Sequence, residues 1–179
     1  MANTTTKVVT DVVRLSYPHI WEPASMDGNS EPKYSASIII PKEDAKTVAA
    51  INAAIDAAIR DGAAKLGTKV NKAALKLPLR DGDLKDDPAY QGCWFINANS
   101  KSRPQVVDRA VKPVLDQDMV YAGCYVRVSL NFYAYNFNGS KGVAAGLGNI
   151  QFVRDGERLG GRSSAADDFA TDTQDDFLS

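Results

Sequence analysis

The residues best suited to chemistry lie between Tyr121 and Phe137, a segment that holds six of the fifteen aromatic residues of the chain. Successive side chains of a β-strand point to opposite faces, so the segment predicts two different surfaces. The apolar face consists of Val126, Val128, Leu130, Phe132 and Ala134. The other face carries Tyr125, Arg127, Ser129, Asn131, Tyr133 and Tyr135. Aromatic rings, a guanidinium and short hydrogen-bonding groups are typical of a surface that stacks bases and holds phosphates.

Tyrosines on an exposed strand also pack across strands without binding a ligand. Three tyrosines and an arginine on one polar face favour a binding surface over packing alone.

A second strand is expected over residues 93–101. If Trp94, Ile96 and Ala98 point inward, then Phe95, Asn97, Asn99 and Lys101 point outward. The inverse register exposes Trp94, and the sequence leaves both registers open. Arg103 follows this strand, and two further basic residues lie opposite the apolar faces of earlier strands. The predicted nucleic-acid-binding residues are therefore Tyr125, Arg127, Asn131, Tyr133, Tyr135, Phe95, Lys101, Arg103, Arg14 and Lys33.

Four acidic residues, Asp81, Asp83, Asp86 and Asp87, lie in a polar, turn-rich segment. Their spacing does not match a calcium-binding loop, which needs alternate ligands, a glycine at the sixth position and a glutamate at the twelfth. A solvated turn is the expected role. The alternative is a metal-dependent nuclease that uses Asp81 and Asp83, with carboxylates from other elements.

Two cysteines, Cys93 and Cys124, are separated by 31 residues, and His19 is the single histidine. These are too few ligands for a zinc site, and the spacing does not suit a redox pair. We therefore expect free thiols, a structural His19, no metal, no cofactor and no catalytic centre.

The net charge of −1 conceals an uneven distribution. Residues 165–179 contain five aspartates and no lysine or arginine, which leaves 17 acidic and 21 basic residues in residues 1–164. The triplet Asp-Asp-Phe occurs twice in this tail, as Asp167, Asp168, Phe169 and as Asp175, Asp176, Phe177. An aromatic anchor flanked by carboxylates can dock on a basic-rimmed pocket of a partner, or lie across the basic surface of the protein itself.

Hydrophobic periodicity predicts mainly β-structure with one amphipathic helix. Strands are expected over residues 7–17, with Val9, Val13, Leu15 and Tyr17 on one face, and over 33–40, 93–101 and 123–137. The dipeptide Asn138-Gly139 predicts a hairpin, with returning strands over 142–147 and 150–153. The helix is expected over 45–66, with an apolar stripe of Val48, Ile51, Ile55 and Ile59.

This order of elements indicates a small β-barrel or sandwich. We expect one domain over residues 1–162 and a flexible acidic tail over 163–179, because the tail composition cannot bury enough apolar surface. No membrane span or export signal is expected.

Four motifs in order resemble the single-stranded DNA-binding proteins of tailed bacteriophages, a family once grouped as a domain of unknown function. They are the runs 14–18 (RLSYP), 77–83 (LPLRDGD), 131–136 (NFYAYN) and 142–147 (GVAAGL). The resemblance covers roughly residues 8–161. It implies an OB-fold, binding of single-stranded DNA without strong sequence preference, and an acidic tail that recruits replication proteins. The tail resembles that of the family, which ends in or near an aromatic residue, but Phe177 is followed by Leu178 and Ser179 and is not the last residue.

The expected function is single-stranded DNA binding in phage replication or recombination, in the cytoplasm of an infected bacterium. Expected partners are single-stranded DNA, duplex DNA more weakly, and a polymerase or helicase through the tail; a homodimer is left open. The alternatives are the nuclease above and a phage structural protein whose exposed aromatics serve assembly.

Overall fold

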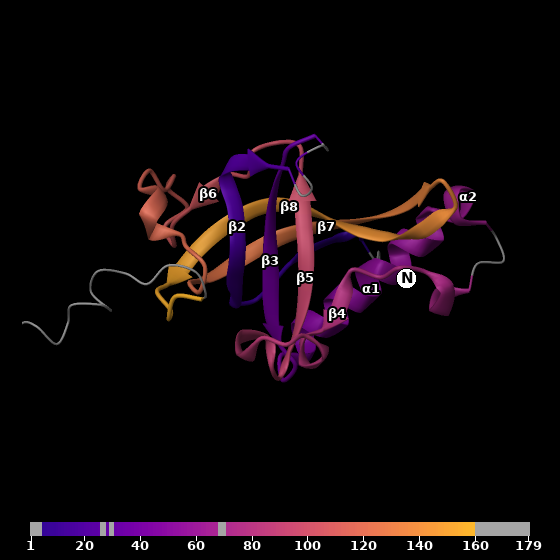
Figure 1. The fold of residues 1–179 in the computed structure, drawn as a ribbon, viewed down its shortest axis with the longest axis horizontal. Coiled ribbons are helices and arrows are strands. Elements are labelled where there is room, and N and C mark those ends of the chain that lie inside the picture. The colour runs from indigo at the N-terminus through magenta and orange to yellow at the C-terminus, as the bar shows by residue number, and fades with distance from the viewer. Residues whose placement is uncertain (1–4, 26–27, 29–30, 68–70, 160–179) are drawn as a thin grey trace, which may run out of the picture.

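A long hairpin of β7 (Tyr125–Phe137) and β8 (Ser140–Arg154) runs through the whole molecule in the computed structural model (Figure 1). The structure describes residues 5–25, 28, 31–67 and 71–159. Asn138 and Gly139 form the predicted turn, with φ values of 51° and 85°, which suit a two-residue hairpin loop. The two returning strands expected after the turn are one continuous strand, because β8 keeps its pairing with β7 across two register shifts.

The sheet closes on itself into a small barrel. Strand β2 (Val13–Ala24) pairs with β7 and β3 (Lys33–Pro41), and β3 pairs with β5 (Cys93–Ser100). Strand β5 then pairs in parallel with β8, which returns to β7. Three short strands join this circuit, namely β1 (Lys7–Val9) on β7, β4 (Leu79–Asp81) on β5 and β6 (Val106–Val107) on β8. The mainly β prediction is confirmed, as a barrel rather than a sandwich.

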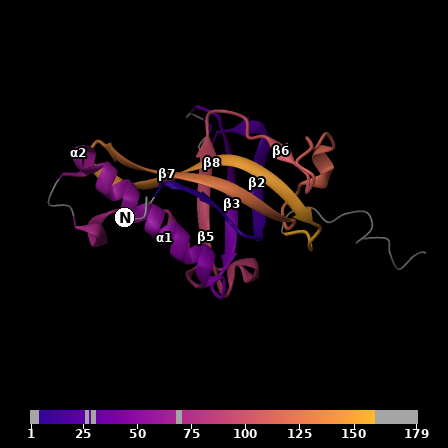
Figure 2. The same cartoon turned by 180° about the vertical axis from the view of Figure 1, so that it is seen from behind.

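The inner face of β7 forms the core, as its alternation predicted. Val126, Val128, Leu130 and Phe132 are each at most 1 % exposed. Helix α1 (Ala45–Asp61) packs across β7 behind the barrel (Figure 2) and buries its apolar stripe at Ile51 and Ile55. The side chain of Asp44 caps the helix by accepting a hydrogen bond from the Thr47 amide at 3.2 Å.

The predicted helix is divided at Gly62. A second helix, α2 (Ala63–Leu66), follows α1 directly and ends at Gly67. Gly62 lies against Ala134 of β7 so closely that a Cβ atom at position 62 would overlap the Ala134 methyl group. This contact explains why glycine occupies the break.

The prediction of one strand over residues 7–17 is wrong in two respects. The segment forms two strands, β1 and β2, and the break between them shifts the inward–outward alternation of the side chains, so that Val8 is buried and Val9 is 56 % exposed. Strand β2 also continues past Pro18 to Ala24. A register shift between Ser16 and His19, with a positive φ of 44° at Tyr17, turns the Tyr17 side chain outward.

Strand β5 adopts the register with Ile96 and Ala98 in the core and Trp94 packed against it. Phe95 points to the opposite face, as that register predicts, but it is only 7 % exposed. It packs with Ile39 and with Tyr90, whose ring lies edge-on at 5.2 Å. The expectation that Phe95 presents its ring to solvent is therefore wrong, because the segment before β5 folds over it.

The covering segment consists of β4 and three short 3-10 turns around it, η1 (Lys72–Ala74), η2 (Gly82–Leu84) and η3 (Pro88–Tyr90). A fourth 3-10 turn, η4 (Gln117–Met119), lies outside this segment and precedes β7. Lys42 lies 2.7 Å from a carboxylate oxygen of both Asp81 and Asp83. Asp83 also accepts a hydrogen bond from the Gly92 amide at 2.7 Å. These two partly exposed carboxylates hold the turn in place. The sequence favoured a solvated turn over a metal site, and the ion pairs add a structural role that it did not predict.

The ion pairs with Lys42 shift the titration of the two carboxyl groups. The pKa of Asp81 is lowered chiefly by Lys42, and that of Asp83 is lowered by the Gly92 amide and then by Lys42. Among the described residues no group of three or more His, Cys, Asp or Glu side chains could hold a metal ion. The nuclease alternative gains no support from this cluster, whose carboxylates face a lysine.

Both cysteines are free thiols. Burial raises the pKa of Cys124 to about 11, and it also raises the pKa of Cys93. The helices within the described ranges are all too short or too polar to cross a membrane. The domain boundary expected at residue 162 lies outside the described residues.

We predict that Gly62→Ala destabilises the protein by about 1 to 3 kcal/mol, because the new methyl group overpacks the contact with Ala134. Helix propensity alone predicts the opposite sign, by about 1 kcal/mol in favour of alanine. Urea denaturation followed by circular dichroism measures the difference. The double variant Gly62→Ala/Ala134→Gly should recover part of the loss. A midpoint of Gly62→Ala equal to or above that of wild type would contradict the close-contact explanation.

We predict that Lys42→Met reduces the acid sensitivity of the fold. A carboxyl group with a lowered pKa stabilises the folded state at pH values above its ordinary pKa of 3.8. This stabilisation is lost as the pH falls through the lowered pKa of the folded state. Thermal unfolding of both proteins from about pH 6 to about pH 3 measures the difference. Wild type should lose more stability below about pH 4 than the variant does. Parallel curves for the two proteins would show that Lys42 does not act on these carboxylates.

Candidate nucleic-acid interface

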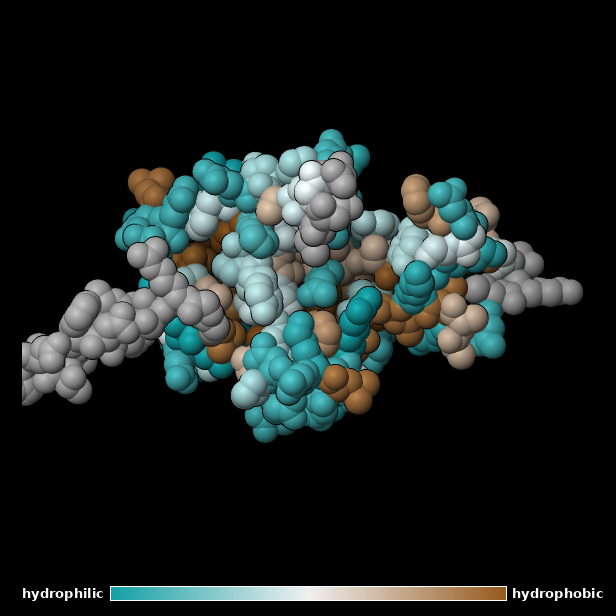
Figure 3. Space-filling model, viewed as in Figure 1, coloured by the Kyte–Doolittle hydropathy of each residue, from teal (hydrophilic) through white to brown (hydrophobic). Residues whose placement is uncertain are grey.

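A hollow with a volume of about 870 Å³ lies on the outer face of β2, β3 and β5. We call it the front groove. Its floor carries the polar side chains of Ser35, Ser37, Asn97 and Asn99, which alternate along β3 and β5 with smaller or inward-pointing residues. It is lined by Tyr17, His19, Ala24, Glu31, Lys33, Ser35, Ala36, Ser37, Lys85, Asn97, Ala98, Asn99, Lys101 and Phe137. Figure 3 shows this face as mainly hydrophilic, with smaller hydrophobic areas between the polar ones.

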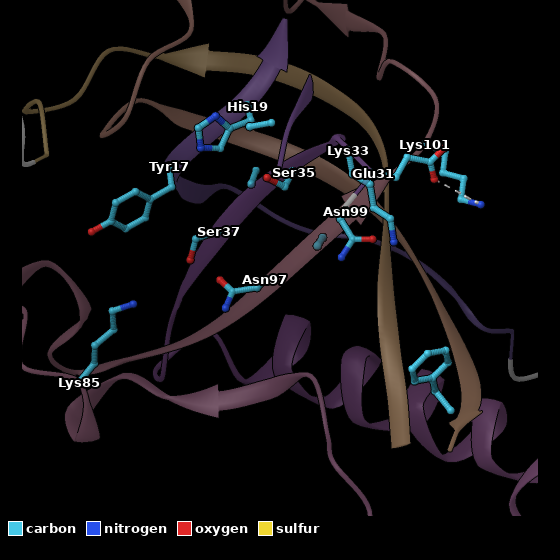
Figure 4. Close-up of a pocket in the computed structure, with 14 residues that line it drawn as sticks. Tyr17, His19, Glu31, Lys33, Ser35, Ser37, Lys85, Asn97, Asn99 and Lys101 are labelled. Carbon is cyan, nitrogen blue, oxygen red and sulfur yellow. Dashed lines mark ion pairs between the residues drawn. The ribbon is translucent and has the colours of Figure 1, made fainter. Parts of the chain in front are cut away.

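The charge of the front groove is positive. Lysines 33, 85 and 101 line it, and Glu31 is the one acidic residue among the lining residues of the described chain. The Lys101 Nζ lies 3.9 Å from a carboxylate oxygen of Glu31 at one end of the groove (Figure 4). Both side chains are largely exposed, so this ion pair is weak and leaves Lys101 able to exchange it for another anion.

Tyr17 and Lys85 lie together at the other end of the front groove (Figure 4). The ring of Tyr17 is 59 % exposed, and Lys85 Nζ lies 5.8 Å from its centroid. The same ammonium group lies 4.5 Å from the Tyr90 centroid and 5.0 Å from that of Phe95. Cation–π attraction to three rings holds the lysine over the groove. This end therefore offers an exposed aromatic face beside a positive charge.

A smaller hollow of about 160 Å³, which we call the side hollow, adjoins the front groove. Asn97 and Asn99 line both, so the two form one surface. The side hollow is bordered by Arg80, by Lys76 and by Tyr135 of β7. The combined surface thus reaches from Tyr17 to the outer face of the β7–β8 hairpin.

Three of the ten predicted binding residues line this combined surface. They are Lys33 and Lys101 in the front groove and Tyr135 in the side hollow. Tyr133, 42 % exposed, and Asn131 lie on the same outer face of β7 as Tyr135. The alternation of β7 therefore placed these side chains on the outer face of the strand, as predicted.

Three other predicted residues, Arg14, Tyr125 and Arg103, lie elsewhere. The guanidinium of Arg14 donates to the carbonyl oxygens of Gly123 and Glu157, at 3.1 and 2.6 Å, and so anchors the chain after β8. Tyr125 lies beneath Arg154, whose guanidinium carbon is 4.2 Å from the ring centroid. Arg103 lies over Trp21 at 5.6 Å. The ten predicted residues therefore do not lie in one groove, because β7 crosses the barrel and its two ends face different sides (Figure 2).

Arg127 lines a separate hollow of about 320 Å³ on the outer face of β7 and β8. We call it the back hollow. Phe95, the remaining predicted residue, is buried beneath Tyr90 as described above.

The sequence reasoning did not select Tyr17, His19, Lys85 or Phe137. Tyr17 was assigned to the inner face because strict alternation cannot anticipate a bulge. His19 was expected to be structural, yet it is exposed and lines the front groove. Lys85 reaches the front groove from the covering segment, and no sequence pattern around Lys85 indicates this position. Phe137 was identifiable as an aromatic residue next to the hairpin turn, and it is 74 % exposed.

The two Asp-Asp-Phe triplets, Asp167, Asp168, Phe169 and Asp175, Asp176, Phe177, lie outside the described residues. Their predicted role stays a prediction.

Known proteins resemble this chain over most of its length. A protein designated putative protein p50 of Acyrthosiphon pisum secondary endosymbiont phage 1 is 36 % identical over 170 residues, which is 91 % of this chain and 92 % of that protein. A C-terminal truncation of the single-stranded DNA-binding protein of bacteriophage Enc34 has a similar structure, with a TM-score of 0.73 and 25 % identity, covering 86 % of this chain and 88 % of the other.

The Enc34 protein in complex with single-stranded DNA matches with a TM-score of 0.70 and 27 % identity, over 87 % of this chain and 90 % of that one. The barrel is an OB-fold, as the resemblance in the sequence implied. The model of the family described as the Enterobacter phage Enc34 ssDNA-binding protein matches residues 6–178. This chain therefore belongs to the Enc34 single-stranded DNA-binding protein family.

Proposed function

We propose that the protein binds single-stranded DNA, with little sequence preference, in the front groove and the side hollow. The observation that carries the proposal is the pairing of exposed rings with lysines along one polar, open face of the barrel. A relative of the same fold, 27 % identical, has been solved in complex with single-stranded DNA. This relative supports the assignment of the ligand class.

Each part of the surface suits one part of the ligand. The lysines of the front groove neutralise phosphates, and the resulting release of counterions favours binding at low salt. Tyr17, Phe137 and Tyr135 offer ring faces on which bases stack. Every base has such a face, so stacking discriminates little between sequences. In a duplex the same faces are already covered by neighbouring base pairs, which is why we expect duplex DNA to bind more weakly.

We further propose that the protein acts in phage replication or recombination, without catalytic activity, in the cytoplasm of the infected bacterium. The acidic tail then has two roles, which are to modulate DNA binding and to recruit a replication protein such as a polymerase or helicase. The sequence supports the second role by placing a phenylalanine beside paired aspartates twice in the tail.

We predict that Tyr17→Ala weakens binding to an oligo-dT strand by about 1 to 3 kcal/mol, the typical contribution of one stacked base. Fluorescence anisotropy of a labelled strand at low salt measures the affinity. Tyr17→Phe should retain most of it, because the ring remains. Leu115→Ala is a matched control, since Leu115 is 90 % exposed but does not line the front groove or the side hollow. Failure of wild type to bind the strand at low salt would refute the proposed function itself.

We predict that removing residues 165–179 tightens binding to single-stranded DNA, because five negative charges no longer repel phosphates or compete for the lysines. The difference from the full chain should shrink as salt rises, since screening weakens both effects. The same anisotropy titration at several salt concentrations tests this. Equal affinity at low salt would restrict the tail to the recruitment of partners.

A further inference from the structure

The back hollow is not used by the proposed function. It lies on the outer face of β7 and β8, between β1 on one side and the chain around β6 on the other. Figure 2 shows β7 and β8 in front of β2 and β3, so the back hollow opens on the side of the barrel opposite the front groove. Its volume of about 320 Å³ is twice that of the side hollow.

Two basic side chains, Lys7 and Arg127, border the back hollow, and their charged nitrogens are available to a ligand. The Arg127 Nε donates to the Thr10 carbonyl oxygen at 3.0 Å, which fixes one edge of the guanidinium. Within the described ranges, nothing pairs with its two terminal nitrogens or with the Lys7 ammonium group by hydrogen bond or ion pair. The floor adds the polar side chains of Asn149 and Gln151, and the described lining residues include no aspartate or glutamate. An anion with several acceptor oxygens fits this chemistry.

The back hollow and the side hollow are joined by the outer face of one strand. Tyr135 lines the side hollow and Arg127 lines the back hollow, and both point outward from β7. The distance along the strand between them is about 26 Å, at roughly 3.3 Å per residue. Tyr133 and Asn131 lie between them on this face and are exposed.

The neighbouring strand leaves this face open. Tyr133 and Asn131 pair with Ala144 and Gly146 of β8, whose side chains are too small to cover a ring. The Asn131 Oδ1 accepts a hydrogen bond from Thr6 Oγ1 at 3.2 Å, which leaves its amide nitrogen available. An extended strand leaving the side hollow would therefore meet the ring of Tyr133, then the amide of Asn131 beside Lys7, with which it pairs, and then the guanidinium of Arg127.

We propose that the back hollow is a second phosphate-binding site, which holds the single-stranded DNA that continues from the front groove along the outer face of β7. This inference rests on the proposed function and extends it. It assigns Arg127 and Lys7 to nucleotides beyond those in the front groove, and Tyr133 to a base between the two sites. Short strands fill only the front groove and the side hollow, whereas longer strands also reach the back hollow. An OB-fold typically covers about 4 to 16 nucleotides, and the longer path belongs at the upper end of that range.

The test compares strand lengths in the full-length protein. Oligo-dT strands of about 6 and about 20 nucleotides bracket the site sizes typical of an OB-fold. We expect Lys7→Ala/Arg127→Ala to leave the affinity for the short strand unchanged and to lower it for the long strand. The slope of log K against log salt should fall in magnitude by about 1.4 for the long strand alone, at about 0.7 for each lost phosphate contact.

A matched control removes one lysine and one arginine elsewhere. Lys46 and Arg60 are exposed on α1 and line none of the described hollows, so Lys46→Ala/Arg60→Ala makes the same change in net charge. It should reproduce neither the length dependence nor the change in slope. Circular dichroism and thermal unfolding establish that both double variants are folded.

Three results would overturn the inference. The first is an equal effect of Lys7→Ala/Arg127→Ala on both strand lengths, and the second is no effect on either. The third is a change in self-association, measured by sedimentation, with unchanged DNA binding, which would assign the back hollow to a protein partner. A failure of the proposed function gives a different result, because wild type would then bind neither strand.

Discussion

The pairing of β7 with three other strands is the constraint on which the rest of the structure depends. β7 pairs with β1 and β2 along one edge and with β8 along the other, and its inner side chains form the centre of the core. Burial of one face determines the direction of the other, because alternate residues of a strand point to opposite sides. The outer face, with its rings and polar groups, is therefore presented to solvent as a consequence of core packing.

The closure of the barrel determines where that outer face leads. β8 pairs with β7 along most of its length and also pairs with β5. The β7–β8 hairpin therefore crosses behind the sheet formed by β2, β3 and β5 (Figure 1). Residues near the turn lie beside the front groove, whereas residues near the start of β7 lie on the far side of the barrel. One strand thereby carries residues that belong to two different surfaces.

The loop before β5 links stability to the binding surface. Lys42 holds Asp81 and Asp83, and the loop that they fix carries Lys85 over the rings of Tyr17, Tyr90 and Phe95. The acidic cluster that suggested a metal site is thus part of the support for one end of the front groove. The covering loop also buries Phe95, which shows that one element can remove one ring from solvent while it positions a cation for another.

Net charge alone does not account for the proposed binding of DNA. Its net charge is −1, and the basic surplus of residues 1–164 is only four. The structure shows that positive charge is concentrated in the front groove, where three lysines and a single glutamate are among the described lining residues. In the proposed binding mode, the exposed rings of Tyr17 and Phe137 stack on bases, an interaction that does not depend on net charge.

The sequence by itself determined the features that depend on near neighbours in the chain. The inner face of β7, the Asn138-Gly139 turn and the stripe on α1 are local patterns that the structure confirmed. The family motifs are local patterns too, and the match to the family model confirmed the resemblance. Tertiary structure alone decided the rest. The bulge at Tyr17, the burial of Phe95 and the separation of Arg127 from Lys33 depend on which strands pair and which loop covers them. These are contacts between residues far apart in the chain, and no periodicity within a single segment encodes them.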